Sequence, residues 1–319
     1  KVRGGRTYRE AVLIDNRDFS FPKRVRLVSD GPEPATLAPD GNGPAVRLVS
    51  VERFEIEGFR LDAGGRAAAI ELGSYLSGTK LRNLVIDGAT GTGVLGLGPA
   101  GGFGNERLTV ENVTVRGAGG EAVGVRLTGG ESTATGHVLL RGLRLLGPMS
   151  AGLVIDDVAS DIELRESVLS EAGDGVRIAG SPRLRDLVVR NNTFFRTGRG
   201  IVFEAMPESG SDGFAFRRNI FAESATADAV VERGFDFDAF TRMLTTQGAP
   251  IEHNLTTRPE PAENGIDLFS SRGRRGAELA FVSTDPSQPA FLVPTSASAA
   301  AKAGGGQGPD GYAGALPPQ

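Results

Sequence analysis

Arginines stand at one equivalent position in four consecutive sequence repeats: Arg141, Arg165, Arg190 and Arg217. The same position in other repeats is held by further charged residues: Glu57, Arg82, Glu111 and Glu252. If the repeats stack as neighbouring strands, about 4.8 Å separates successive arginines, and like charges at that spacing repel one another. A uronic-acid or sulfated polysaccharide along the row would relieve this repulsion, and so would ion pairs with nearby acids such as Glu163, Glu166 and Asp186. The pattern therefore predicts either a track for an acidic polysaccharide or a self-paired surface.

A second charged group is expected on the strand that follows a recurring glycine in each repeat. Because side chains alternate between the two faces of a strand, five charged residues fall on its outer face: Arg126, Asp156, Arg177, Glu204 and Glu232. The two arginines are further candidates for binding an anionic ligand. Arg177 and the three acids are also the candidates for catalysis.

Three catalytic arrangements fit this outer face. Asp156 and Glu204 lie two repeats apart, on the order of 9 to 10 Å, close to the roughly 6.5 to 9.5 Å of inverting glycosidases. Glu204 and Glu232 lie one repeat apart, at about 5 Å, which fits a retaining pair or a shared Ca²⁺ ion. Arg177 beside Asp156 fits a lyase, in which a base acts next to a carboxylate neutralised by Ca²⁺ or arginine. The alternative is a set of cross-strand ion pairs on a solvated surface.

The composition weighs against catalysis and limits the partners. The chain has no Cys and no Trp, 3 Tyr and 2 His, so it lacks a thiolate nucleophile and has few aromatic platforms for sugars. A net charge of -4 argues against a general nucleic-acid binder, and no apolar run approaches a membrane span. We therefore expect no nucleic-acid partner, no membrane span and no cofactor or metal, with Ca²⁺ a candidate only if the chain is a lyase. The oligomeric state is left open.

The positions of these charged residues are set by a sequence repeat that runs through most of the chain. Similar phrases begin at Ile56, Leu81, Val110, Leu140, Leu164, Val189, Phe216 and Ile251. Their starts differ by 24 to 35 residues, too irregular for helical repeats and natural for coils with variable loops. Each phrase alternates as strand, turn and strand, and a third strand follows a glycine. The sequence thus predicts an all-β parallel β-helix, a solenoid of about nine to ten three-strand coils around a continuous core.

Polar side chains are also expected inside the coils. The position between the first two strands is Gly or Asn in the early repeats, and these residues tolerate the left-handed backbone of a sharp bend. The next position points inward and becomes polar in the last four repeats: Ser167, Asn192, Asn219 and Asn254. Because buried polar groups must be hydrogen-bonded, we interpret the three asparagines as an internal ladder of stacked amides rather than as ligand contacts.

The phrase VRNNTFFRTGRGIVF, from Val189 to Phe203, resembles the generic repeat of the right-handed parallel β-helix, or pectate-lyase-like, superfamily. The opening phrases RTYREAVLI and KRVRLVSDG, and the ending from Phe281 to Leu316, are similar to the first coils and closing segment of secreted bacterial β-helix proteins. The resemblance implies a right-handed solenoid, an extracytoplasmic location, polysaccharide binding on the outer face of the third strands and an irregular segment over the last coil. The histidine, paired-aspartate and calcium-binding motifs of enzymes in that superfamily are missing.

We expect one domain over residues 1–319, with first coils at 1–50, regular coils at 51–278 and a closing segment at 279–319. A break in the repeat predicts a short helix near 236–247 that packs against the coils. Because the chain opens within a coil-like phrase, we expect it to be part of a longer protein. The predicted function is a non-catalytic, secreted or cell-surface module that recognises an acidic polysaccharide or serves as a module of a surface protein. The alternatives are a polysaccharide lyase or glycoside hydrolase, and an architectural or partner-binding appendage of a multidomain, for example kinase-like, protein.

Overall fold

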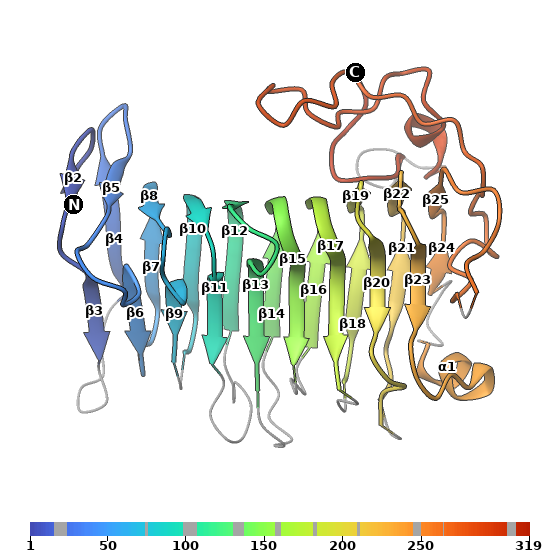
Figure 1. The fold of residues 1–319 in the computed structure, drawn as a ribbon, viewed down its shortest axis with the longest axis horizontal. Coiled ribbons are helices and arrows are strands. Elements are labelled where there is room, and N and C mark those ends of the chain that lie inside the picture. The colour runs from blue at the N-terminus through green and yellow to red at the C-terminus, as the bar shows by residue number, and fades with distance from the viewer. Residues whose placement is uncertain are drawn as a thin grey trace.

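A computed structural model describes residues 1–15, 24–73, 76–97, 107–129, 137–156, 161–180, 184–208, 211–244, 250–263, 265–304 and 311–319. The chain winds into an all-β parallel solenoid in which strands pair with their counterparts one coil further along (Figure 1). It completes about seven turns, so the nine to ten predicted were too many. Four strands at the two ends of the solenoid are only 2 residues long: β1 (Val2–Arg3), β2 (Thr7–Tyr8), β24 (Ile251–Glu252) and β25 (Leu255–Thr256).

Three parallel sheets form the walls of the solenoid. The first sheet contains β1, β4 (Val25–Asp30), β7 (Phe54–Glu57), the first parts of β10 (Thr79–Ala89) and β12 (Arg107–Gly117), β14 (His137–Arg141), β16 (Asp161–Arg165), β18 (Leu187–Arg190), β21 (Ala215–Arg217) and β24. The second sheet contains β2, β5 (Ala35–Leu37), β8 (Phe59–Asp62), the later parts of β10 and β12, the first parts of β15 (Arg144–Asp156) and β17 (Val168–Ala179), β19 (Thr193–Phe195), β22 (Ile220–Ala222) and β25. The third sheet contains β3 (Val12–Asp15), β6 (Val46–Val49), β9 (Ala68–Leu72), β11 (Thr92–Leu97), β13 (Val123–Thr128), the ends of β15 and β17, β20 (Arg199–Phe203) and β23 (Ala227–Val231).

The recurring glycine at the start of the third strands lets large core side chains pack beneath it. A Cβ atom on Gly175 would lie 2.4 Å from a ring carbon of Phe194 and 2.5 Å from the carbonyl oxygen of Gly200. A Cβ atom on Gly200 would lie 2.5 Å from a ring carbon of Phe221. These glycines are therefore required for space, and the rings fill the volume that their missing side chains leave.

Asn192, Asn219 and Asn254 are fully buried and stack inside successive coils. Asn192 Nδ2 donates to Asn219 Oδ1 at 3.1 Å, and Asn219 Nδ2 donates to Asn254 Oδ1 at 3.0 Å. The same two oxygens accept from the backbone N–H groups of Asn192 at 3.0 Å and Asn219 at 2.9 Å. At the start of the ladder, Ser167 N donates to Asn192 Oδ1, and Ser167 Oγ accepts from Leu143 N, both at 3.0 Å. The ladder thus ties the sharp turns of consecutive coils together inside the core.

The helix expected in the break of the repeat is present as α1 (Phe237–Met243), capped by the Asp236 side chain. Phe240 and Met243 are buried in the core, and the Phe240 ring meets Phe203 edge-on at 6.3 Å. Residues 245–247 of the predicted range lie outside the described residues.

In the part of the chain that the structure covers, no helix has the length and apolarity needed to cross a membrane.

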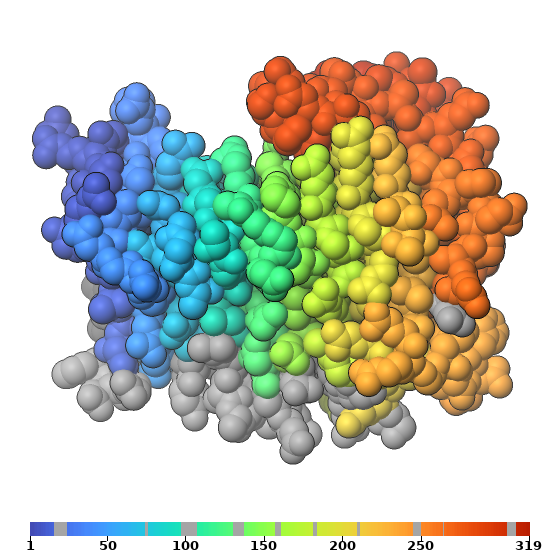
Figure 2. Space-filling view, viewed as in Figure 1, coloured from blue at the N-terminus to red at the C-terminus, as the bar shows by residue number. Residues whose placement is uncertain are grey.

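The C-terminal segment was expected over the last coil, but much of it runs back along the flank of the solenoid (Figures 1 and 2). It has one short 3-10 turn at Ala299–Lys302. Its apolar residues pack on the outer face of the second sheet, against Leu146, Val168, Phe195, Ile220 and Leu255. Gly314 N donates to the Arg218 carbonyl at 2.8 Å, and Ala315 N donates to Thr193 Oγ1 at 3.0 Å. The second sheet of the later coils is therefore buried on both faces.

Candidate functional site

The four arginines of the equivalent position form a row across the first sheet. Arg141 pairs in register with Arg165, Arg165 with Arg190, and Arg190 with Arg217. Each arginine directly precedes the sharp turn into the second strand. Their side chains are 42%, 22%, 28% and 27% exposed, in chain order, so each guanidinium lies against the sheet with one side toward solvent. We call these four residues the arginine row.

Carboxylates accompany the arginine row, but unevenly. Arg165 Nη1 lies 3.5 Å from Glu163 Oε1, and Arg190 Nε lies 2.8 Å from the same oxygen, so the two guanidinium groups share one carboxylate. Arg141 lies between two carboxylates, with Nε 2.8 Å from Glu166 and Nη1 3.7 Å from Glu111, and Arg217 Nε lies 3.9 Å from Glu252 Oε1. The row therefore contains both features that the sequence suggested, aligned arginines and ion pairs with nearby acids.

Asp186 was named with Glu163 and Glu166 as a partner for the row, but it stands just before β18, at the opposite end of that strand. Burial, together with the carboxylates of Asp161 and Asp212, raises the pKa of Asp186. Burial and neighbouring acids, and no member of the arginine row, thus account for the raised pKa of this carboxyl group.

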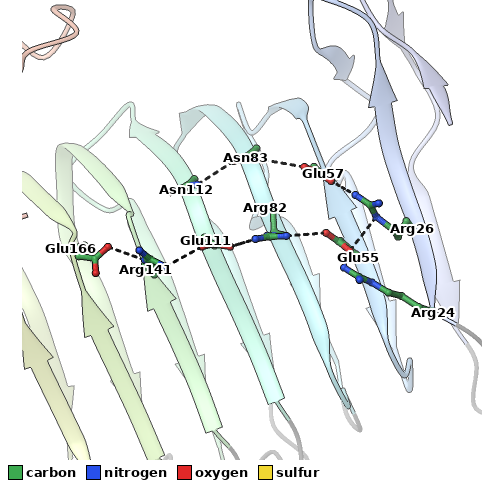
Figure 3. A network of polar contacts seen from close by, with 10 residues as sticks. All are labelled: Arg24, Arg26, Glu55, Glu57, Arg82, Asn83, Glu111, Asn112, Arg141 and Glu166. Atoms are coloured by element: carbon green, nitrogen blue, oxygen red, sulfur yellow. Dashed lines mark hydrogen bonds and ion pairs between the residues drawn. The ribbon is translucent and has the colours of Figure 1, made fainter. Parts of the chain in front are cut away.

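The earlier coils solve the same charge problem by alternation (Figure 3). Arg82 occupies the equivalent position and lies between two carboxylates, with Nη1 3.5 Å from Glu55 and Nη2 2.5 Å from Glu111. On the turn beside it, Asn83 Nδ2 donates to Glu57 Oε1 at 3.1 Å, and Asn112 Nδ2 donates to Asn83 Oδ1 at 3.3 Å. At this strand position the charges of the early coils thus alternate, whereas the four arginines of the row stand side by side and are paired with carboxylates on neighbouring positions and at the two ends of the row.

Glu55 anchors the charges of these early coils and is a charged residue with no exposed surface. Burial alone would raise the pKa of its carboxyl group, but hydrogen bonds and positive charge from Arg24, Arg26 and Arg82 outweigh burial and lower it (Figure 3). A carboxyl group whose pKa is lower in the folded state stabilises the fold above its unfolded pKa, about 4.3 for glutamate, and loses that stabilisation as the pH falls.

We therefore expect Glu55→Gln to lower stability at pH 7 by roughly 1 to 2 kcal/mol, because three half-exposed arginines lose a shared anion but can turn toward water. The difference between variant and wild type should shrink as the pH falls below about 4.3, because the unfolded wild-type chain then takes up a proton at Glu55, and it should vanish once the folded carboxylate is protonated as well. Thermal melts of both proteins from pH 3 to pH 7 measure this. A difference in melting temperature that stays constant over that range would contradict the charge-based explanation.

The outer face of the third sheet carries the other predicted residues, and the expected register is observed. Arg126 pairs with Val154, and Val154 with Arg177, while Asp156 pairs with Ala179. The valine between the two arginines is only 2% exposed and belongs to a small outer cluster with Val123, Ala151 and Ala179. The two arginines therefore do not form a continuous charged surface.

The candidate catalytic side chains on this face have other partners. Arg177 Nε pairs with Asp174 at 2.6 Å, and Arg199 Nε pairs with the same carboxylate at 2.7 Å. Arg199 also contacts Glu232. Glu204 Oε2 accepts from the backbone N–H of Gly180 at 3.1 Å. The ion pairs of Arg177, Arg199 and Glu232 form a network in which Asp174, only 1% exposed, is the centre.

Asp174 and Arg199 were missed from the sequence, although each directly precedes a recurring glycine. A shallow hollow nearby is lined by Gly180, Ala205, Met206, Arg233 and Gly234, and none of the proposed catalytic residues lines it. Within the described ranges, no group of three or more His, Asp or Glu residues is arranged to hold a metal ion.

Comparisons with known proteins give no relative of this chain. No family model, no curated protein and no solved structure matches the chain.

Proposed function

We propose that the protein is a non-catalytic, extracytoplasmic β-helix module of the pectate-lyase-like type that recognises an acidic polysaccharide through the arginine row. The observation that carries this proposal is the in-register stacking of four arginines, two of which share a single carboxylate. Each guanidinium has five N–H donors, of which an ion pair uses only some, so the row has donors that an anionic ligand could still meet. A lyase or hydrolase on the third sheet has less support, because Arg177 and Glu232 are held in ion pairs.

The test compares two arginines that occupy the equivalent position, directly before the sharp turn, in different coils. Arg190→Ala should weaken binding of an acidic polysaccharide by roughly two- to fivefold, the effect of one exposed charge pair. Arg82→Ala, which removes an arginine already lying between two carboxylates, should leave the affinity within about twofold of wild type. Isothermal titration calorimetry with polygalacturonate, alginate and chondroitin sulfate, and with neutral dextran as the ligand control, measures these affinities.

Binding should also weaken as salt rises toward physiological ionic strength, where charges are screened over about 8 Å. The proposal is contradicted if no acidic polymer binds at low salt, or if Arg82→Ala and Arg190→Ala weaken binding equally.

A further inference from the structure

We infer that residues 233–238 form a dimerisation surface, on which Phe237 of each copy of the chain enters the hollow beside Arg233 of the other copy. The inference is independent of the proposed polysaccharide recognition, because it uses no residue of the arginine row. It rests on an exposed aromatic ring, on a hollow of matching chemistry next to that ring, and on opposite charges around the two.

Two exposed phenylalanines stand close together where the chain enters α1. In the described parts of the chain four large apolar side chains are exposed, and two of them are Phe235 and Phe237. Phe235 is 41% exposed and leans on Phe240, with 6.5 Å between the ring centroids. Phe237 is 68% exposed, and its ring contacts no other ring of the described residues. Exposed apolar side chains that gather in one place mark an interaction surface.

The hollow beside these rings suits an aromatic side chain. It is lined by Gly180, Ala205, Met206, Arg233 and Gly234, so its lining is apolar except for one guanidinium. Arg233 Nε donates to the Glu204 carbonyl oxygen at 3.2 Å, which holds the guanidinium in place, and its two terminal nitrogens have no partner among the described residues. An inserted ring would contact the apolar lining and offer its negative face to the guanidinium.

The charges around the ring and the hollow are opposite. Phe237 lies between Asp236 and Asp238, and both acids are exposed. Asp236 Oδ1 accepts from Ala239 N at 3.0 Å and so caps α1, whereas Asp238 has no ion pair with any described residue. A Phe237 ring in the hollow of a second copy therefore brings carboxylates to a guanidinium that lacks them. Such complementarity identifies a second copy as the partner.

The arrangement closes after two copies. The hollow includes Gly234, only three residues before Phe237, so the ring and the hollow lie next to each other on the same chain. A two-fold axis between them lets each copy insert its ring into the other, and the same patch serves on both sides. A contact confined to this stretch is at the small end of specific interfaces, so the dimer should be weak and reversible.

Sedimentation equilibrium tests the inference at protein concentrations from about 10 μM to about 1 mM. The average mass should rise with concentration from 33.3 kDa, the mass of one chain, toward twice that value. Phe237→Ala should weaken the dimer by about 30-fold or more, because an aromatic anchor is lost twice in each dimer. Leu13→Ala is the matched control, since Leu13 is 65% exposed but lies on β3 at the opposite end of the solenoid (Figure 1). It should leave the dissociation constant within about twofold of wild type.

An exchange of charges tests the pairing itself. Asp238→Lys and Arg233→Asp each place like charges across the contact and should weaken the dimer by roughly fivefold or more. The double variant restores opposite charges and should return the dissociation constant to within about threefold of wild type. Thermal melts check that every variant is folded. Three results would each overturn the inference: a wild type that keeps the mass of one chain up to about 1 mM, equal weakening by Phe237→Ala and Leu13→Ala, or a double variant no tighter than the single ones.

Discussion

Replacing Asn219 with leucine is expected to lower the free energy of unfolding by about 3 kcal/mol or more. Asn219 is the middle of the buried ladder, and its Oδ1 accepts from both the backbone and the side chain of Asn192. Its Nδ2 donates to Asn254 Oδ1 at 3.0 Å and to the Val189 carbonyl at 2.9 Å. Leucine removes all four of these buried hydrogen bonds, and each buried group left without a partner costs roughly 1 to 3 kcal/mol.

Urea denaturation of Asn219→Leu and wild type measures this loss. Ser167→Ala is the matched control at the end of the ladder, where the hydroxyl accepts from Leu143 N and donates to the Arg165 carbonyl. It should cost only about 1 kcal/mol, because fewer buried groups lose partners. If the ladder stabilises the fold through its hydrogen bonds, the substitution in the middle must lower the free energy of unfolding more than the substitution at the end. Equal unfolding midpoints for Asn219→Leu and wild type would refute it.

The fold was predictable because two periodicities in the sequence have a direct physical cause. Alternation in phrases such as those starting at Leu164 and Val189 places one residue in two in the core, and both of these leucine and valine side chains are fully buried. The repeat spacing then stacks equivalent residues, which is why the register of the arginine row could be stated before the structure.

The path of the C-terminal segment was not predicted, although the sequence contains a signal for it. In the second strands of the later coils, outer positions such as Val168, Ile220 and Leu255 are apolar, whereas Arg60 holds the corresponding position in an early coil. Apolar residues on both faces of a strand indicate that something covers the outer face. The covering residues come from the C-terminal segment, whose irregular sequence has no periodicity from which its path could be derived.

The candidate sites were only partly predictable, because charge partners depend on geometry that alternation does not give. Arg177 was placed beside Asp156, yet it pairs with Asp174, three residues earlier on its own strand. Between Asp174 and Arg177 lies Gly175, where the strict alternation of faces is lost, so that Asp174 points outward and Val176 inward. The alternation of faces along the strand after Gly175 therefore predicts that Arg177 points outward, but it does not predict that Asp174 is its partner. The sharing of Glu163 by two arginines likewise depends on how long side chains lie across neighbouring strands.

Gly200→Ala should destabilise the protein by about 3 kcal/mol, at the upper end of the 1 to 3 kcal/mol typical of overpacked cores. The new Cβ atom would lie 2.4 Å from the Asp228 carbonyl oxygen and 2.5 Å from a ring carbon of Phe221. The backbone at Asp228, in the next coil, cannot move away from the new Cβ atom without breaking the pairing between the two strands. The Phe221 ring is also fixed, because it stacks on Phe194 at 4.8 Å and meets Phe269 edge-on at 5.9 Å.

Gly119→Ala is the matched control, because a Cβ atom there has no neighbour within 4 Å. It should leave the unfolding midpoint unchanged or raise it slightly, since alanine reduces the freedom of the unfolded chain. Both substitutions reduce the backbone freedom of the unfolded chain in the same way. A difference in stability between them therefore measures the cost of the steric clash at Gly200. If Gly200→Ala and Gly119→Ala unfold at the same urea concentration, the glycines of the third strands are not required for packing, and the explanation of the repeat by core volume is wrong.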